Sequence, residues 1–210
     1  MPAPESAPER ARRVGIFGGT FDPPHIGHDA AARAIVAALD LDRLLLVVAN
    51  DPWQKSPTRP VTPAEDRFAL TRALADGVPG AEASRLEIDR GGPSYSIDTV
   101  EALIGEATAA GQPRPEVFLV VGADLVPQLE TWERSADLAG LITLAVVSRP
   151  TTPRPSVPPG WDVIWVDGPQ VDVSSSAVRE ALGQGRRIDR MVPPDVIHCI
   201  ARRGLYAVGR

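Results

Sequence analysis

The sequence predicts an α/β protein built on a doubly wound, mostly parallel sheet. Short apolar runs alternate along the chain with longer segments in which apolar residues recur at helical spacing, and this alternation is typical of βαβ units with right-handed crossovers. One run, at 44–49, is apolar throughout, as expected for a strand that a sheet buries on both faces. The chain has 210 residues, of which 43% are hydrophobic, and this is enough to bury the core of one such domain.

The individual elements follow this pattern in order. The first strand lies at 14–17, and an alanine-rich helix over 30–39 comes after the turn that follows it, because Ala31, Ile35 and Leu39 share one helical face. The second strand is the buried run itself. Four further strands are expected at 85–89, 117–121, 141–147 and 161–166, and further helices at 63–76, at 96–109, from about 123, at 175–182 and at 194–203.

The remaining segments set the domain limits. Residues 1–11 are rich in Pro, Ala and Glu without any period, so we expect a disordered leader there. The proline-dense segment 150–160 interrupts the alternation and is expected to be a surface loop. The domain therefore spans 12–210, with a small helical lobe at 168–210.

Charge and cysteine content favour a small-molecule partner. The formal net charge is -5, whereas proteins that bind duplex nucleic acid need a concentrated basic face. Cys199 is the only cysteine, and the sequence has neither an apolar run of membrane-spanning length nor a secretory signal. We expect a cytoplasmic protein with no nucleic-acid or membrane partner, and the sequence leaves a homo-oligomer open.

The segment GGTFDPPHIGH, from Gly18 to His28, carries the strongest functional signal. Its glycines allow unusual backbone angles, and its prolines cannot continue a strand but can open a helix. The N-terminus of that helix offers unpaired N–H groups and about half a positive charge, which favours phosphate. His25 and His28, one turn apart, would face the same anion. The segment therefore predicts a nucleoside triphosphate site.

Other unusual residues follow the ends of the predicted strands. In an open parallel sheet these ends meet at one edge, where ligands bind. The segments are 20–28 after the first strand, 50–55 after the second, 90–96 after the third, 122–124 with Trp132 and Arg134 after the fourth, and 174–176 with Arg179 after the last. The second segment contains Lys55, the only lysine of the chain.

Two common phosphate-binding motifs are absent. The dinucleotide fingerprint needs glycines at offsets zero, two and five, but Gly15, Gly18 and Gly19 stand at offsets zero, three and four. A P-loop needs glycine directly before Lys-Ser and again five residues earlier, where this chain has Gln54 and Ala49. Neither a dehydrogenase nor a P-loop kinase is indicated.

The chain resembles the bacterial nicotinate-nucleotide adenylyltransferases, members of the nucleotidyltransferase superfamily that carry Thr-Phe-Asp-Pro followed by His-x-Gly-His. Both parts stand here in full, at 20–23 and 25–28, and the likeness runs over roughly 13–206. It rests further on the segment 89–95 with Asp98 and Thr99, on 122–124 with Trp132, on 174–176 with Arg179, and on the ending from 192–193 to 205–206. It implies a Rossmann-like fold and a role in NAD biosynthesis.

The implied reaction joins ATP to nicotinate mononucleotide and yields deamido-NAD and pyrophosphate. The 5′-phosphate of the mononucleotide attacks the α-phosphorus of ATP in line, so the protein needs no covalent nucleophile. Its task is positioning and charge stabilisation, together with Mg²⁺. The resemblance implies that this Mg²⁺ is held mainly by the phosphates of ATP, with no metal ligand assigned to the protein.

The resemblance also implies the ATP-side roles. His28 stabilises the transition state, His25 orders the triphosphate, and Lys55 and Arg179 supply positive charge, so these four residues form the catalytic set. Asp124 binds the ribose hydroxyls. The whole predicted ATP site consists of Gly18, Gly19, Thr20, Phe21, Asp22, His25, His28, Gly122, Asp124, Ser175, Ser176 and Arg179.

Several of these residues have a second interpretation. His25 and His28 can cap the helix or pack, Lys55 can be a solvated surface residue, and Asp124 can be a plain N-cap. Phe21 is expected mainly to pack. Asp22 either caps the following helix or organises water and metal, and Ser175 and Ser176 can cap the helix that they precede. His198, the third histidine, is expected to be structural.

For the nicotinate half, the resemblance points to a helix start at Ser94, Tyr95 and Ser96. Backbone N–H groups there would attract the pyridine carboxylate, and Trp132 would stack on the ring. Arg134 either balances the substrate phosphate or forms a surface ion pair. The chain departs from the family at Ser96 and Ser176, where threonine is usual, and in the residues before Lys55.

Three alternatives remain open. Nicotinamide mononucleotide is an alternative substrate, and phosphopantetheine is the substrate of a sister branch that usually has threonine in place of His25. A non-catalytic nucleotide sensor would retain the fold and bind ATP without releasing pyrophosphate.

Overall fold

The computed structural model describes residues 10–52, 60–148, 153–168 and 170–206. The elements, in chain order, are β1 (Arg13–Gly19), α1 (Ile26–Leu39), β2 (Arg43–Val48), α2 (Ala64–Ala75), β3 (Ala81–Ser84), α3 (Leu86–Arg90), α4 (Ser96–Ala109), β4 (Glu116–Gly122), the 3₁₀ helix η1 (Ala123–Thr131), α5 (Ser135–Ala139), β5 (Thr143–Ser148), β6 (Val163–Asp167), α6 (Ser175–Gly183) and α7 (Pro194–Arg203). The expected leader lies outside the described residues except for its last two positions, and only 153–160 of the expected proline-rich loop are described.

The strands form one six-stranded sheet in the order β3-β2-β1-β4-β5-β6. Every neighbouring pair is parallel, so the predicted doubly wound sheet is confirmed. The chain runs outward from β1 in one direction and resumes from β4 in the other, which places the topological switch point between these two strands. Ligands of such sheets bind at that point, beyond the carboxyl ends of the strands.

The sheet carries a hydrophobic core on each face. Successive side chains of β2 alternate between the two cores, with Leu44 and Leu46 on one face and Leu45 and Val47 on the other, because side chains in a strand point to opposite faces in turn. The first core is covered by α1, α2, α6 and α7, and the second by α4, η1 and α5. Burial on both faces explains why the central strands β2 and β4 are apolar along most of their length.

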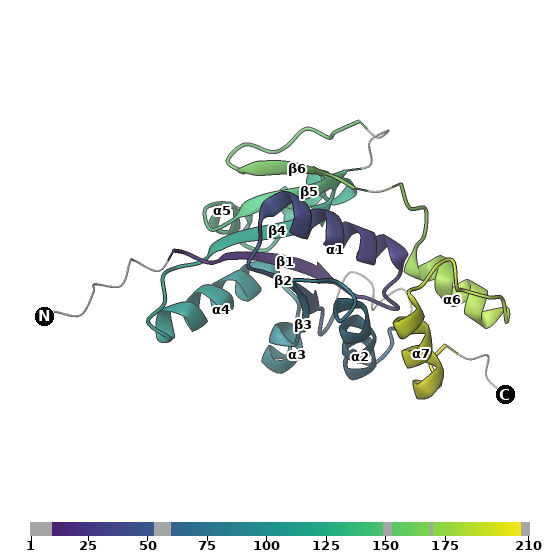
Figure 1. Ribbon diagram of the computed structural model, residues 1–210. Helices are drawn as coiled ribbons and strands as arrows, with labels where there is room; N and C mark the ends of the chain where they lie inside the picture. The colour runs from purple at the N-terminus through teal and green to yellow at the C-terminus, as the bar shows by residue number, and fades with distance from the viewer. Residues whose placement is uncertain (1–9, 53–59, 149–152, 169, 207–210) are drawn as a thin grey trace, which may run out of the picture.

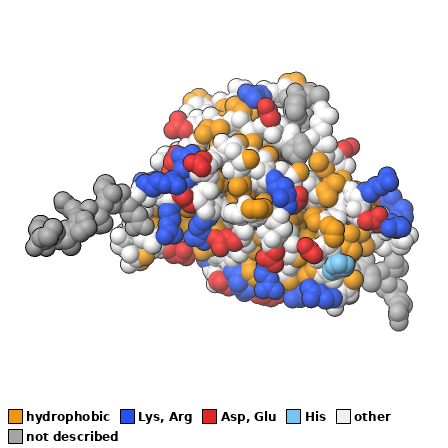
Figure 2. All heavy atoms as spheres, in the orientation of Figure 1, with side chains coloured by type: hydrophobic (Ala, Val, Ile, Leu, Met, Phe, Trp, Pro, Cys, Tyr) orange, Lys and Arg blue, Asp and Glu red, His pale blue; other side chains and the backbone are white. Residues whose placement is uncertain are grey.

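The C-terminal helices belong to the first core. Val178 and Ala181 of α6 and Val196 and Ile200 of α7 are buried in the same cluster as the side chains of α1 and α2. Both helices lie at one end of the molecule, far from α4 (Figure 1). The face seen in Figure 2 has arginine and acidic side chains interspersed. Among the described residues, no helix combines the length and the apolar character needed to cross a lipid bilayer.

The predicted strand at 85–89 is wrong. The third strand is β3, and the residues after it form the short helix α3. Leu86 and Ile88 alternate with polar residues as in a half-buried strand, but Leu86 packs against one core and Ile88 against the other. Glu87 between them is buried and accepts a hydrogen bond of 2.8 Å from the Thr99 hydroxyl. The true strand has the weak pattern AEAS because it is an edge strand that pairs only with β2.

Candidate active site

Two neighbouring cavities open at the carboxyl edge of the sheet, one on each side of the switch point. The first, about 590 Å³, is lined by His25, His28, Gly122, Asp124 and other residues on the α1 side. The second, about 270 Å³, is lined by Thr20, Ser94, Tyr95, Ser96 and Trp132 among others. Val121 of β4 lines both cavities. Of the residues predicted for nicotinate, four line the second cavity: Ser94, Tyr95, Ser96 and Trp132. The residues predicted for ATP are divided. His25, His28, Gly122 and Asp124 line the first cavity, Gly18, Gly19 and Thr20 line the second, and Phe21, Asp22, Ser175, Ser176 and Arg179 line neither.

The N-terminus of α1 is capped by its own two histidines. His25 is the N-cap residue, and its Nδ1 accepts a hydrogen bond of 3.2 Å from the Gly27 N–H. The His25 N–H in turn donates to Nδ1 of His28, also at 3.2 Å. The ring centroids are 3.9 Å apart. This reciprocal capping uses histidines as a capping box uses Ser and Glu, and it holds both imidazoles at the mouth of the first cavity.

Capping also defines the protonation of His25. Burial lowers its pKa from 6.5 to about 4, since desolvation disfavours the charged form. A neutral ring whose Nδ1 accepts a hydrogen bond carries its proton on Nε2. The same acceptor role of Nδ1 leaves Nε2 of His28 as the donor nitrogen. The pair is arranged to donate hydrogen bonds to an anion.

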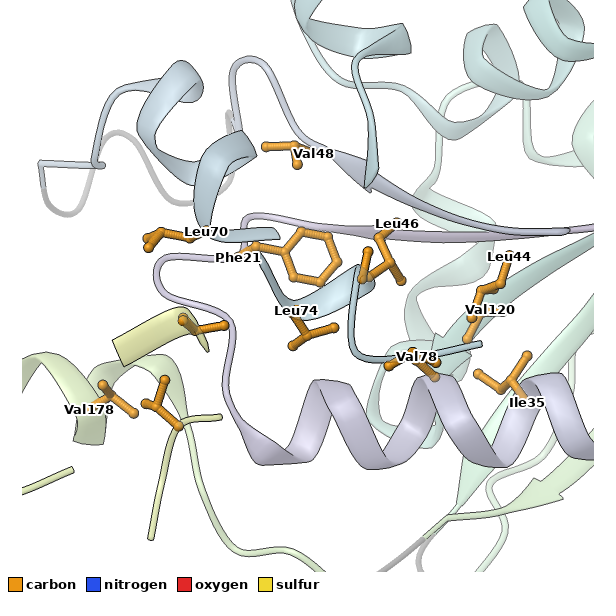
Figure 3. Packing of buried hydrophobic residues seen from close by; sticks show 14 of the residues in the cluster. Phe21, Ile35, Leu44, Leu46, Val48, Leu70, Leu74, Val78, Val120 and Val178 are labelled. Atoms are coloured by element: carbon orange, nitrogen blue, oxygen red, sulfur yellow. The ribbon is translucent and has the colours of Figure 1, made fainter. Parts of the chain in front are cut away.

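Phe21 packs as expected and sets the turn before the histidines. Its side chain is buried in the first core between β2 and α2, beside Leu70 and Leu74 (Figure 3). Its backbone has φ 49°, a left-handed conformation that is uncommon outside glycine. A Cβ at Gly19 would lie only 2.9 Å from this ring. The Phe21 ring also lies 5.0 Å from the His28 ring, centroid to centroid, so the core fixes the position of this histidine.

Asp22 is not the cap of α1, because His25 occupies that position. Its buried carboxylate accepts a hydrogen bond of 2.8 Å from the Tyr206 hydroxyl, and its carbonyl oxygen accepts one of 2.6 Å from Arg179. A second contact of 4.0 Å joins this guanidinium to the Asp22 carboxylate. Burial is the main cause that raises the pKa of Tyr206. The turn is thus tied to the C-terminal segment.

The start of α6 lies against the same turn. The N-cap residue of α6 is Ser174, whose hydroxyl accepts a hydrogen bond of 3.2 Å from the Ala177 N–H. The prediction that Ser175 or Ser176 caps this helix is therefore wrong. Ser175 donates instead to the Pro23 carbonyl at 2.9 Å, and Ser176 accepts from Arg179 at 3.1 Å. The hydroxyls and the guanidinium of the predicted phosphate clamp therefore meet beside the histidine motif.

Gly122 and Asp124 stand where β4 passes into η1. Gly122 precedes the first residue of this 3₁₀ helix, and both residues line the first cavity together with the histidines. Asp124 is exposed. Ser148 and Gly168, at the ends of the last two strands, close the same cavity and were not singled out from the sequence.

The second cavity contains the residues predicted for the nicotinate half. Ser94, Tyr95 and Ser96 lead into the N-terminus of α4, and Trp132 follows η1. The Ser94 hydroxyl accepts a hydrogen bond of 2.9 Å from the Asn50 N–H, which ties the loop after β2 to the loop before α4.

Arg134 is held elsewhere. Its guanidinium donates to Glu101 at 2.8 Å and to Asp137 at 2.8 Å, and all three side chains are well exposed. It does not line the second cavity. The geometry therefore matches the surface ion pair that was its alternative interpretation.

Two other predicted residues need separate mention. Lys55 lies outside the described residues. His198 is exposed on α7 and lines neither of the two cavities at the sheet edge.

Sequence reasoning missed Arg67 in α2. This side chain is only 1% exposed, although arginine is almost never fully buried unless it is paired. It donates to main-chain carbonyls at the ends of β1 and β2, namely those of Thr20 and Ala49. A sequence signal exists, because Arg67 stands on the apolar face of α2, three and seven residues before Leu70 and Leu74.

Comparison with known proteins agrees with this architecture. A family model described as cytidylyltransferase-like matches residues 16–181. A probable nicotinate-nucleotide adenylyltransferase of Acidothermus cellulolyticus is 37% identical over 201 residues, covering 94% of this chain and 95% of that protein. One from Thermus thermophilus is 40% identical over 194 residues, covering 92% of this chain and 99% of that protein.

Solved structures support the fold. The nicotinic acid mononucleotide adenylyltransferase of Plasmodium falciparum, complexed with NaAD, superposes with a TM-score of 0.73 at 16% identity, covering 93% of this chain and 97% of that one. The sheet order and the two cavities at its edge define a Rossmann-like nucleotidyltransferase fold. The extent of the family match then settles the membership: the chain belongs to the cytidylyltransferase-like family.

Proposed function

We propose that this protein transfers the adenylyl group of ATP to nicotinate mononucleotide, as the names of its relatives indicate for them. An oxygen of the mononucleotide's 5′-phosphate bonds to the α-phosphorus of ATP, the bond from this phosphorus to the bridging oxygen breaks, and pyrophosphate leaves. The products are deamido-NAD and pyrophosphate. The observation that carries the proposal is the pair of adjoining cavities on the two sides of the switch point.

The first cavity suits ATP. Two imidazoles whose Nδ1 atoms are taken by backbone N–H groups present Nε2–H donors to phosphate oxygens, and such preorganised donors stabilise the charge that develops in the transition state. The positive end of α1 acts in the same direction. Arg179, held at the Asp22 carbonyl, adds a fixed cation, and Asp124 at the far wall fits the ribose hydroxyls.

The second cavity suits a flat anionic ring. Trp132 offers an indole face for stacking, and the start of α4 offers backbone N–H groups to a carboxylate. Because the cavities adjoin at Val121, a nucleotide in each would bring the two phosphate groups together over the end of β4. Holding two reactants in this way removes much of the entropic barrier to their reaction.

Mg²⁺ enters the proposal as part of the substrate MgATP. The buried Asp22 carboxylate is already bound by the Tyr206 hydroxyl, and the described residues contain no cluster of three or more His, Cys, Asp or Glu side chains that could hold a metal. These residues fit a metal that is carried by phosphate oxygens, the ligands that Mg²⁺ commonly shares with one or two carboxylates. A single cysteine is compatible with the cytoplasm as the place of the reaction.

The test is a pyrophosphate-release assay with ATP and four acceptor conditions: nicotinate mononucleotide, nicotinamide mononucleotide, phosphopantetheine and none. We expect release with nicotinate mononucleotide, and loss of release when Mg²⁺ is chelated. Equal rates for the acid and the amide would remove the argument for carboxylate recognition. ATP binding without release under any condition would point to a nucleotide sensor instead.

A further inference from the structure

Arg67 joins the segment after β1 to the segment after β2 through main-chain carbonyls. Its Nη1 donates to the carbonyls of Thr20 at 2.9 Å and Ala49 at 2.7 Å. Its Nη2 donates to Asn50 at 3.1 Å, and its Nε to Thr62 at 2.7 Å. A planar guanidinium can serve several acceptors at fixed angles, and here its acceptors come from three separate stretches of the chain.

The carbonyls of Thr20 and Ala49 lie where the pairing of β1 with β2 ends. The last rung between β1 and β2 is the hydrogen bond of 2.9 Å from the Ala49 N–H to the Gly19 carbonyl. The register between β1 and β2 ends at Gly19 and Val48, and the next carbonyl on each chain, that of Thr20 and that of Ala49, needs a donor from elsewhere. Arg67 supplies donors to both. It therefore determines how far apart the two loops stand after the sheet ends.

Each loop continues directly into one half of the site. From Thr20 the chain runs to His25 at the start of α1. From Asn50 two hydrogen bonds reach the loop before α4: its N–H donates to the Ser94 hydroxyl at 2.9 Å, and its side-chain amide donates to the Gly92 carbonyl at 3.0 Å. A continuous set of contacts thus leads from the histidine motif through Arg67 and Asn50 to the nicotinate side.

We infer that Arg67 is a positioning residue that, through Asn50, holds the triphosphate half and the acceptor half of the site in register. The inference rests on the proposed function. A single-nucleotide ligand is held by one half, so its affinity depends little on this register. The in-line reaction and the binding of the dinucleotide product involve both halves, so both depend on it strongly, since a misplacement of about 1 Å can cost about a hundredfold in rate.

The test compares Arg67→Lys with Arg72→Lys, a change at an exposed arginine of the same helix. Lysine keeps the charge but has one nitrogen, which cannot serve the same set of carbonyls. Activity is expressed per folded molecule, with the folded fraction measured by circular dichroism. We expect kcat of Arg67→Lys to fall about a hundredfold and Kd for deamido-NAD to rise about tenfold.

The single-substrate affinities separate positioning from mere stability. For Arg67→Lys, Kd for ATP alone and for nicotinate mononucleotide alone should each change by less than about threefold, because these contacts are made within one half. Arg72→Lys should leave all four quantities unchanged. A kcat per folded molecule and a dinucleotide affinity at wild-type values in Arg67→Lys would overturn the inference.

A second variant decides the question if Arg67→Lys does not fold. Asn50→Ala removes only the amide contact with Gly92 and leaves the core intact. It should lower kcat and the dinucleotide affinity by about fivefold, less than Arg67→Lys because only one hydrogen bond is lost. The affinities for ATP alone and for nicotinate mononucleotide alone should not change. No change in either quantity would overturn the inference. Failure of the proposed function looks different, because the wild type itself would then release no pyrophosphate.

Discussion

At the scale of single residues, the histidine pair combines two roles in one set of atoms. Nδ1 of each ring accepts a backbone N–H at the start of α1, and both rings line the first cavity. The motif spacing predicts that both rings face the same anion, and both rings line the same cavity. Helix capping was the alternative interpretation of this pair, although histidine is not a preferred N-cap residue, and the structure shows that role.

His28→Ala should lower kcat by about a hundredfold, the usual scale for the loss of one preorganised donor. His28→Asn separates the two roles, since its side-chain oxygen can replace Nδ1 as the cap acceptor but nothing replaces Nε2–H. We expect the same loss of turnover with a melting temperature closer to wild type. His198→Ala, at an exposed position on α7, serves as the control. Near-normal turnover in His28→Asn would contradict the assigned role.

His25 should make stability depend on pH. Its folded pKa of about 4 lies below the unperturbed 6.5, so between these values the unfolded chain binds a proton that the folded chain does not. Stability is therefore complete above about pH 6.5 and falls as the pH drops toward 4, by about 3 kcal/mol in total. Denaturant unfolding at several pH values measures this fall.

His25→Asn is the matched control for that titration, because asparagine caps a helix without titrating. Other groups contribute equally to both proteins and cancel in the difference. The wild type should lose more stability than the variant over this interval. Parallel stability curves would show that His25 is not held neutral.

At the scale of elements, the errors of prediction have local causes. The edge strand β3 has too few apolar residues to be recognised as a strand. The helix α3 has the alternating pattern of a strand because its two apolar side chains pack against different cores. The strong apolar strands β2 and β4 were predicted within about two residues at each end. The helix after β4 was predicted in kind, but it is a 3₁₀ helix with Pro127 inside it.

The cap of α6 can be tested directly. Ser174→Ala removes the side-chain acceptor of the Ala177 N–H and should destabilise the protein by about 1 kcal/mol. Ser174→Asn should restore the loss, since asparagine is an equally good cap. Thermal unfolding of the three proteins measures the effect. A stable Ser174→Ala variant would mean that the start of α6 is held by its contacts with the Pro23 turn alone.

At the scale of the whole molecule, the C-terminal helices pack into the first of the two cores. Val178 and Val196 share a cluster with Ile35 of α1 and Leu70 of α2. The ending also reaches the site, because Tyr206 binds the Asp22 carboxylate. Folding of the C-terminal segment and formation of the histidine turn should therefore be coupled.

A chain that ends at Gly185 tests this coupling. It lacks α7 and exposes the apolar side chains of α1 and α2 that α7 covers, so we expect loss of cooperative thermal unfolding and increased binding of a hydrophobic dye. The full-length chain is the reference in both measurements. A truncated protein that unfolds in one sharp transition at the original temperature would show that folding of the remaining chain does not depend on α7.

The sequence by itself determined the order of most elements, the parallel sheet and the identity of the motif from Thr20 to His28, because burial period and turn chemistry are properties of neighbouring residues. Only the tertiary structure decided which residues far apart in the sequence come into contact. The contacts of Arg67 with the Thr20 and Ala49 carbonyls and of Tyr206 with Asp22 join positions 47, 18 and 184 residues apart. Such pairings depend on how the sheet and its covering helices fold together, and no local pattern encodes them.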